Sequence, residues 1–297
     1  MKFLKTFFNK INSNLHYLMV LPAIILFSIF FICPLLSVIG LSLTDYNGLT
    51  APNFIGFKNF VDFFSDLRAR KDIINTVFFA IGSAPLLNIF GFIYALVLDK
   101  NFKAKSIVRA IVYLPAIISP LIMGYIWYFI LQPKRGILFI IAKTLNLGIA
   151  NTNWLGDRYI ALLVLVFVNV WQYVGITMII YLAGLQLIPV EVMEAAKIDG
   201  ASYFRTLRSI IIPLITPAIK INVITNIIGS LSVFEIIVAL TDGGPGYNTE
   251  SLSIYILRMV HGAFAGYSTA VAVILFFIIL PPVVIFLKWI RSKEVEM

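Results

Sequence analysis

The sequence predicts an all-α polytopic membrane protein with six transmembrane helices joined by short loops. Of its 297 residues, 60% are hydrophobic and only 12% are charged, whereas a soluble domain is close to half apolar and a quarter charged. Apolar runs of about 20 residues, the length needed to cross the hydrocarbon core of a bilayer, recur along the chain. The predicted spans lie at 18–43, 74–98, 107–131, 160–185, 217–240 and 270–290.

The N-terminus carries lysines before its first apolar run, as a secretory signal peptide does. The run is too long for a signal peptide and shows no small-residue cleavage site, so we interpret it as a retained span. We therefore expect a cytoplasmic segment at 1–17, one transmembrane domain at 18–291 and a cytoplasmic tail at 292–297. A single cysteine, Cys33, excludes a disulfide framework within the chain.

Orientation follows from the Lys and Arg residues of the loops, which are enriched on the cytoplasmic side of a membrane. With both termini in the cytoplasm, 13 basic residues lie inside and 9 outside, and Lys220 lies near a membrane face. The inside loops are also shorter, so their density of positive charge is higher. The net charge of +9 is then a consequence of topology, and we do not expect a nucleic-acid partner.

The outer loops and the third span carry local signals. Phe54 to Asp66 alternates aromatic and polar residues, as in a short helix lying on the outer surface. Two prolines between Leu114 and Pro120 predict a kink in the third span, which either lines a cavity or has no functional meaning. Trp127 and Tyr128 are interpreted as interfacial anchors, and Pro133 to Gly136 as the following outer turn.

The stretch Thr241 to Arg258 follows the fifth run. Its glycines and Pro245 predict a tight outer turn. The residues around Tyr255 and Ile256 predict a short helix before the last span.

The loop at 187–216 is too polar to face lipid. Its charged residues are Glu191, Glu194, Lys197, Asp199, Arg205 and Arg208. The pattern predicts a helix that begins at Pro189 and ends at Gly200, since glycine takes the left-handed cap conformation without strain. Val192, Met193 and Ala196 give this helix one apolar face.

A second short helix is expected to begin at Ser202, a residue type typical of the N-cap position. Phe204, Leu207 and Ile211 would then share one side of that helix, and Pro213 lies near its end. A helix, a glycine turn and a helix between two spans fit an ordinary amphipathic loop on the lipid headgroups as well as a docking element for a partner.

The amino-acid sequence of this loop resembles the EAA motif of the permease subunits of binding-protein-dependent ABC importers. Glu194-Ala195-Ala196 is followed after three residues by Gly200 and later by Ile211 to Leu214. The preceding LAGLQLIP, the IDGAS around Gly200 and the GGPG after the fifth run are similar to the carbohydrate-uptake branch of that family. The resemblance implies the type I importer fold, with 187–216 as a cytoplasmic coupling loop. The ATPase-coupling residues would be Glu194, Ala195, Ala196, Lys197, Asp199, Gly200, Ala201, Ser202 and Tyr203.

Motifs of enzymes are absent from the sequence. There is no GxxxxGK[ST] phosphate loop, HExxH, CxxC or GxSxG, and His16 and His261 are expected at opposite membrane faces. We therefore expect a transport subunit without catalytic residues, metal or cofactor of its own. The resemblance places ATP and Mg on a separate ATPase subunit.

Polar residues cluster in the fourth and fifth predicted spans, where they are costly in lipid and so face protein or water. Asn222, Asn226 and Ser230 recur at four-residue spacing, which places them on one helical face. Amides, hydroxyls and flat aromatic rings suit a sugar, although interhelical hydrogen bonding explains such residues equally well. The residues predicted to line a substrate path are Asn169, Trp171, Tyr173, Asn226, Gly229, Ser230 and Glu235.

Glu235 is the only acid well inside a predicted span, and its role stays open. It could contact substrate, pair with a basic group of a partner subunit, bind a coupling cation, or be solvated at the outer end of the span. The alternatives to carbohydrate import are ABC import of glycerol phosphate or another polar solute, and an ion-coupled secondary transporter that uses Glu235. Secondary transporters usually show internal repeats, and none is visible.

The resemblance also implies partners in the bacterial cell membrane. These are a second, similar permease subunit, giving a heterodimer, a dimer of ATP-binding subunits, and an extracytoplasmic sugar-binding protein or lipoprotein. The cargo would be an oligosaccharide or a related sugar.

Overall fold

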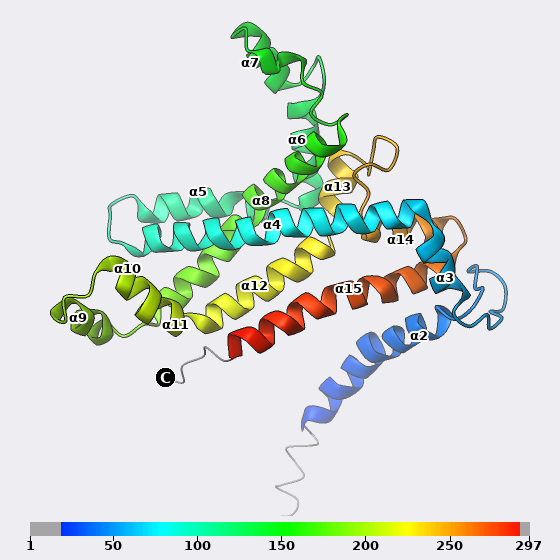
Figure 1. Cartoon of the computed structure of the whole chain (residues 1–297), viewed down its shortest axis with the longest axis horizontal. Helices are drawn as coiled ribbons and strands as arrows, with labels where there is room; N and C mark the ends of the chain where they lie inside the picture. The colour runs from blue at the N-terminus through cyan, green and yellow to red at the C-terminus, as the bar shows by residue number, and fades with distance from the viewer. Residues whose placement is uncertain (1–18, 292–297) are drawn as a thin grey trace, which may run out of the picture. The chain divides into compact units, whose positions relative to one another are not determined.

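A computed structural model describes residues 19–291 of the chain, and helices make up nearly all of its regular structure (Figure 1). In that part the β pairing is one isolated bridge, between Thr44 and Phe54. The predicted segments 1–17 and 292–297, with the N-terminal lysines and His16, lie outside the described residues. The chain divides into two units, a smaller one (1–63 and 259–273) and a larger one (64–258 and 274–297).

The smaller unit begins with an apolar helix at Met19–Leu41 that contains the π-helical turn η1 (Ser28–Ile32) and α2 (Cys33–Leu41). No side chain of η1 or α2 is buried, as expected of a helix that faces lipid. The short helix predicted near Phe54 to Asp66 is present as α3 (Lys58–Ser65). The Asn59 amide donates to the carbonyl of Ser42 at 2.9 Å and thereby ties α3 to the end of α2.

The larger unit is built on α4 (Leu67–Asp99) and α8 (Arg158–Gln186), which pack along each other (Figure 1). The buried side of α4 carries many small residues, including Ala84, Gly91 and Ala95. A methyl group at Gly91 would lie 2.5 Å from the Thr177 side chain of α8. Small residues allow the two backbones this close approach, which is typical of helix pairs in membranes.

The third predicted span is broken. It forms α5 (Lys105–Ile117) and α6 (Pro120–Leu131), which meet at an angle of 96°. Ser119 is extended because a residue before proline avoids the helical region. The proline signal was therefore right, but it marks a break between two helices rather than a kink within one. Trp127 of α6 packs edge-to-face on Phe167 and Trp171.

The prediction of one continuous helix at 217–240 was wrong. The structure has α12 (Thr216–Leu231) and a separate short helix, α13 (Glu235–Leu240). The Ser251 hydroxyl donates to the Val233 carbonyl at 2.8 Å, which satisfies a backbone group freed by the break. Glu235 is consequently the first residue of α13 and directly follows the break.

Within residues 19–291, four unbroken helices are long and apolar enough to cross a membrane. They are Met19–Leu41, Leu67–Asp99, Arg158–Gln186 and Ala265–Arg291, the last being α15. Two bent pairs raise the number to six if each pair is one span: α5 with α6, and the helical segment Tyr203–Leu214 with α12, which bends by 74°. Six spans thus stay a prediction that the described helices fit.

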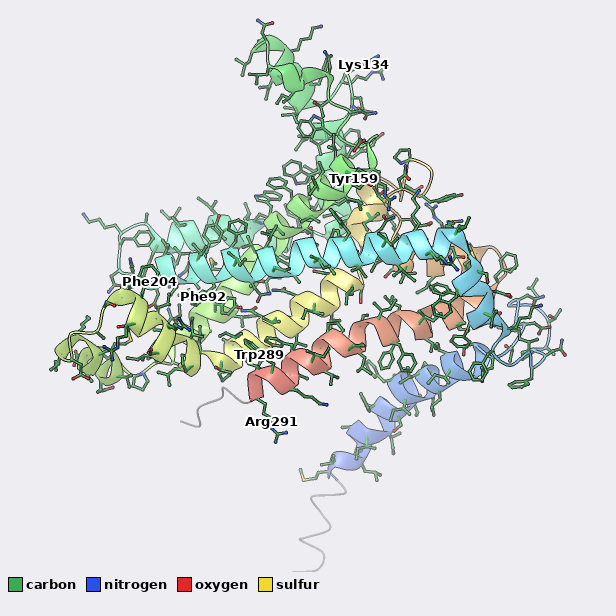
Figure 2. The ribbon with its side chains drawn as sticks, in the orientation of Figure 1. Phe92, Lys134, Tyr159, Phe204, Trp289 and Arg291 are labelled. Carbon is green, nitrogen blue, oxygen red and sulfur yellow. The ribbon has the colours of Figure 1, made fainter. Side chains whose placement is uncertain are left out.

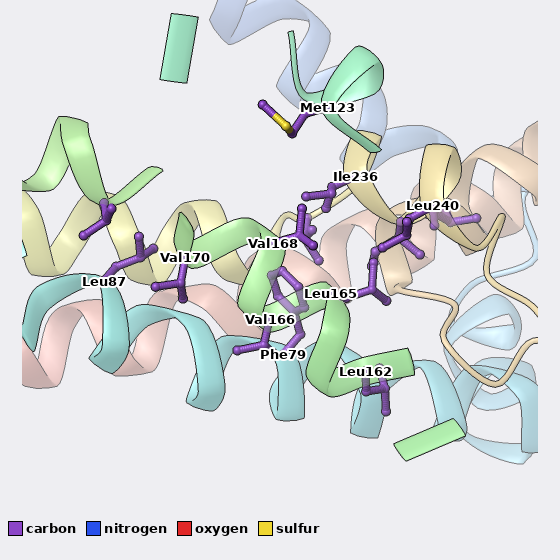
Figure 3. Packing of buried hydrophobic residues seen from close by; sticks show 14 residues of the cluster. Phe79, Leu87, Met123, Leu162, Leu165, Val166, Val168, Val170, Ile236 and Leu240 are labelled. Carbon is purple, nitrogen blue, oxygen red and sulfur yellow. The ribbon is translucent and has the colours of Figure 1, made fainter. Parts of the chain in front are cut away.

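Two hydrophobic clusters hold the larger unit together. The first joins α4, α6, α8 and α13 through residues such as Phe79, Met123, Leu165 and Ile236 (Figure 3). The second lies toward the other end of α8 and contains Leu98, Met178, Tyr181, Leu185, Ile211, Ile215 and Ala218. Because its members come from α4, α8 and the segment that enters α12, the second cluster connects these helices directly.

The remaining described elements are short. They are α7 (Ile137–Thr144), the 3-10 turn η2 (Gly148–Asn151), α9 (Val190–Ile198), α10 (Tyr203–Thr206), the π-helical turn η3 (Leu207–Ile211), α11 (Ile212–Leu214) and α14 (Leu252–His261). The predicted short helix around Tyr255 is α14. Nothing in the sequence analysis anticipated α7.

Candidate functional site

A cavity of about 380 Å³ lies beside α8, α12 and the start of α13. Its polar lining consists of Asn169, Tyr173, Thr177, Asn222, Thr225, Asn226, Ser230, Ser232 and Glu235. Its other lining residues are Leu87, Pro120, Ile176, Ile180, Gly229, Val233, Phe234 and Ile236. Its volume falls in the range of small-molecule sites.

Six of the seven residues predicted for the substrate path line this cavity. They are Asn169, Tyr173, Asn226, Gly229, Ser230 and Glu235. Trp171 does not: 40% of its surface is exposed, and its ring packs edge-to-face on Trp127. Two residues along a helix correspond to a rotation of about 200°, so Trp171 lies on the side of α8 opposite Asn169.

The hydrogen bonds show that these polar residues also join helices. The Asn222 amide donates to the backbone carbonyl of Thr177 at 3.1 Å. The Asn226 amide donates to the Thr177 hydroxyl at 3.2 Å. Asn222 and Asn226 therefore act between α12 and α8 while their edges line the cavity, so the two interpretations of the sequence are compatible.

Thr177 and Thr225 are cavity residues that the sequence analysis missed. A signal for Thr177 was present, because Asn169, Tyr173 and Thr177 recur at four-residue spacing on α8. Two other residues of α8, Gln172 and Gly175, do not line the cavity. The Gln172 amide donates to the Ile118 carbonyl at 3.0 Å, at the break between α5 and α6.

The break between α12 and α13 shapes one wall of the cavity. Ser232 and Phe234 lie in the break, and Glu235 follows as the first residue of α13. The Glu235 side chain is exposed, and no ion pair joins it to a described residue. Amides, hydroxyls, a carboxylate and two aromatic rings can bind the hydroxyl groups and apolar ring faces of a sugar.

The segment at 187–216 forms the predicted helix, glycine turn and helix. Gly200 has φ +69°. The amide of Gly200 donates to the Lys197 carbonyl at 3.1 Å, and that of Ala201 donates to the Ala196 carbonyl at 3.0 Å. These two bonds are the Schellman motif that ends a helix at glycine. Ser202 caps α10, its hydroxyl accepting from the Arg205 amide at 3.4 Å.

One side of this segment packs on the protein and the other is exposed. Ala196 is buried, and Met193 and Leu207 pack on the second hydrophobic cluster. Ile198 is 85% exposed and Phe204 is 79% exposed; Phe204 is labelled in Figure 2. The prediction that Phe204 shares a side with Leu207 and Ile211 was therefore wrong.

The wider turn of η3 changes the angular spacing between Phe204 and the residues that follow. Among the predicted coupling residues, Glu194, Ala195, Lys197, Asp199, Gly200, Ser202 and Tyr203 are exposed, Ala201 is half-buried, and Ala196 faces the core.

Residues 88–293 match the family described as binding-protein-dependent transport system inner membrane component. The match covers more than half of the chain and includes α8, α12 and the segment at 187–216. The chain belongs to this family. The predicted family is thereby confirmed, and with it a location in a membrane.

Similar proteins extend the match to nearly the whole chain. The probable starch degradation products transport system permease protein AmyD of Thermoanaerobacterium thermosulfurigenes is 32% identical over 96% of this chain and 97% of its own length. The trehalose/maltose transport system permease protein MalF of Thermococcus litoralis is 32% identical over 95% of this chain and 96% of its own.

Solved structures agree with the fold. A chain in the crystal structure of a bacterial ABC transporter involved in the import of the acidic polysaccharide alginate superposes with a TM-score of 0.81 at 27% identity. The superposition covers 97% of this chain and 99% of that one. A second alginate ABC transporter structure, in complex with an alginate pentasaccharide-bound periplasmic protein, gives a TM-score of 0.82 at 26% identity. The predicted all-α type I importer fold is confirmed.

This permease also contains an ionic cluster that the sequence analysis missed. Glu250 has a fully buried side chain and accepts two bonds from the Arg68 guanidinium, at 2.7 and 2.9 Å. Arg258 lies 3.2 Å from the same carboxylate, and the Asn75 amide donates to the Glu250 carbonyl at 3.0 Å. Arg68 also lies over the Tyr247 ring, 3.6 Å from its centroid.

The predicted tight turn in Thr241 to Arg258 is present in this permease. Gly243 and Gly246 have φ +71° and +59°, and the Thr249 hydroxyl donates to the Gly244 carbonyl at 2.9 Å. Through the bonds between Glu250 and Arg68 the turn is attached to the start of α4.

Proposed function

We propose that this permease subunit carries a carbohydrate, an oligosaccharide or related sugar, into the cytoplasm as part of an ATP-driven, binding-protein-dependent ABC importer. The observation that supports the proposal is the continuous side-chain packing that connects the helices of the polar cavity to the exposed segment at 187–216. Met193 and Leu207 of that segment pack on the same cluster as Met178 and Ile215. Met178 follows Thr177, which lines the cavity.

The exposed side of the segment at 187–216 supplies the surface that a cytoplasmic ATPase would bind. Its polar residues Glu194, Lys197 and Asp199 flank the apolar Ile198, and Phe204 and Tyr203 extend the apolar surface onto α10. A mixed surface with exposed aromatic and aliphatic residues is typical of a binding site for another protein. ATP and Mg belong to that ATPase, and Glu194 to Tyr203 transmit force without chemistry of their own.

The transport cycle is a rigid-body change between two states. ATP-driven closure of an ATPase dimer displaces α9 and α10, and the second hydrophobic cluster passes that displacement to α8 and α12. These are the helices beside the cavity, so the access of the cavity to either side of the membrane changes. A second permease subunit completes the path, both termini lie in the cytoplasm, and a sugar-binding protein delivers the cargo from outside.

Within the cavity, each residue type has a distinct role toward a sugar. Asn169, Asn226 and Ser230 exchange hydrogen bonds with sugar hydroxyls, and the ring of Tyr173 packs on an apolar ring face. Gly229 has open space where a side chain would be, so a ligand can approach the α12 backbone there. Trp171 is withdrawn from this set because it lies on the other side of α8.

An ion-coupled transporter is the second candidate, and the unpaired Glu235 is the observation that favours it. Uptake by the complex reconstituted in proteoliposomes distinguishes the two energy sources. We expect accumulation of a labelled maltooligosaccharide to require ATP and to survive ionophores that collapse ion gradients. Uptake that stops with the ionophore and proceeds without ATP would contradict the importer proposal.

The variant Gly200→Asp tests whether the segment at 187–216 couples to the ATPase, and Phe204→Leu is its control. A side chain at φ +69° is strained, and the new carboxylate would stand on the exposed face that contacts the ATPase. We expect the variant to insert in the membrane and to lose transport, whereas Phe204→Leu keeps the apolar surface and most activity. Normal uptake by Gly200→Asp would remove the coupling interpretation.

A further inference from the structure

The cavity has one acidic side chain and no basic one. Among the residues that line it, the ionisable groups are the Tyr173 phenol and the Glu235 carboxylate, and neither Lys nor Arg is present. The amides and hydroxyls of the other polar residues carry no net charge. The electrostatic potential of this part of the path is therefore negative.

Glu235 is free to act on a ligand because nothing in the described part of the chain neutralises it. The ion pairs there involve Arg68, Arg258, Glu250 and Asp242, and all of them lie outside the cavity lining. The carboxylate is exposed and lines the same cavity as the Tyr173 phenol. An acid that served only to stabilise the fold would be expected to have a partner or to be buried among donors.

A carboxylate in a cleft with apolar walls selects ligands by charge. Low-dielectric walls focus the field, so cations gather in the cleft and anions are kept out. A carboxylate also accepts strong hydrogen bonds from hydroxyl groups, which all sugars carry, and from the ammonium groups of amino sugars with a free amine. It has nothing to offer the carboxylate of a uronic acid or the phosphate of a sugar phosphate.

We propose that Glu235 is a specificity-determining residue, which admits neutral and amino sugars to the path and excludes uronates and sugar phosphates. This inference rests on the proposed function, and it narrows the substrate class. It also separates this permease from the structural neighbour whose transporter imports the acidic polysaccharide alginate, and it argues against the glycerol phosphate alternative.

A cysteine introduced into the cavity and modified by charged reagents tests the proposal, and the natural sugar need not be known. In the complete complex, purified with its partners in lipid nanodiscs, Cys33 is replaced by serine and Thr225 by cysteine. Thr225 lines the cavity and its side chain is exposed. The rates at which cationic and anionic methanethiosulfonate reagents modify this cysteine are measured from the mass of the permease chain, with Glu235 and with Glu235→Gln.

With Glu235 present, we expect the cationic reagent to react faster than the anionic one, after correction for their intrinsic rates. Glu235→Gln should lower that ratio several-fold at low ionic strength, since a nearby unit charge changes the local concentrations of the cationic and anionic reagents in opposite directions. Asp242→Asn is the matched control, because it removes an exposed negative charge outside the cavity. It should leave the ratio unchanged.

An equal ratio with Glu235 and Glu235→Gln would overturn the proposal, and would indicate that a partner subunit neutralises the acid. A cysteine that neither reagent reaches would also overturn it, because Glu235 would then face no aqueous path. Either result together with ATP-dependent sugar uptake would leave the importer proposal standing. Loss of ATP-dependent uptake by the unmodified complex would instead contradict the importer proposal itself.

Discussion

Two glutamates of the larger unit, fifteen residues apart, are held in opposite ways. Glu250 is fully buried and contacts the guanidinium groups of Arg68 and Arg258. Glu235 is exposed in a polar cavity and has no ion-pair partner in the described part of the chain. A buried acid needs partners that offset its loss of hydration, whereas an exposed acid without partners remains available to a ligand. On this difference we propose a structural role for Glu250 and a role in transport for Glu235.

The surroundings of the two acids support the same division. Around Glu250, Asn75 donates to its backbone carbonyl and Tyr247 lies over Arg68, so the turn that contains Tyr247 and Glu250 is attached to α4 at several points. Arg158 of α8 donates to the side-chain amide oxygen (Oδ1) of Asn75 at 3.0 Å and extends the network to a third element. Around Glu235, a break in the helix leaves space in place of partners.

Removing Glu250 should have the largest effect on stability. Glu250→Ala leaves Arg68 and Arg258 without their shared carboxylate, and breaking a buried pair costs about 3 kcal/mol or more. We expect the purified complex to melt at a clearly lower temperature, as measured by tryptophan fluorescence. A melting temperature equal to that of the wild type would show that the cluster does not stabilise the fold.

The two arginines should differ from each other. Arg68 makes two short bonds to Glu250 and lies over an aromatic ring, so Arg68→Ala should cost about 2 kcal/mol. Arg258 makes a single, longer contact to Glu250, and its other bonds go to the exposed Asp242, so Arg258→Ala should cost about 1 kcal/mol. The melting temperature should be lowered more by Arg68→Ala than by Arg258→Ala. A larger decrease for Arg258→Ala would contradict the assignment of Arg68 as the main partner of Glu250.

Cavity residues should affect transport more than stability. Asn226→Ala removes a bond to Thr177 and one amide facing the cavity, and Ser230→Ala removes a hydroxyl. We expect each to raise the KM for sugar uptake several-fold, with a loss of stability of about 1 kcal/mol or less. Unchanged uptake kinetics in both variants would show that these residues only join helices and do not contact the substrate.

The smallest expected effect on stability belongs to Glu235. Glu235→Gln removes a charge without a partner, so the melting temperature should stay within the equivalent of about 0.5 kcal/mol while the charge preference of the cavity changes. A melting temperature lowered as far as that of Glu250→Ala would show that Glu235 is a structural acid and would end the contrast between the two.

Local signals let the sequence predict much of this permease. The helix ending at Gly200, the cap at Ser202 and the turn around Pro245 depend on residues close in sequence, and the structure contains each of them. Four-residue spacing likewise placed Asn226 and Ser230 at the cavity. Each of these patterns is complete within a few turns of chain.

Features that depend on distant residues were not predictable in the same way. Arg68 and Glu250 are 182 positions apart, and no pattern in one sequence joins them. The break after Leu231 contains neither proline nor glycine, so it carries no local signal, and Glu235 was consequently placed inside a span. Trp171 was assigned to the path by residue type alone, although its helical position relative to Asn169 already argued against it.

The most direct test of the central claim is purification of this chain from its native membrane in mild detergent, with identification of the proteins that come with it. We expect an ATPase subunit and a second permease subunit, with the ATPase lost when Gly200 is replaced by aspartate. A chain that purifies alone or only with itself, and whose exposed segment at 187–216 binds no ATPase, would contradict the assignment as an ABC importer subunit.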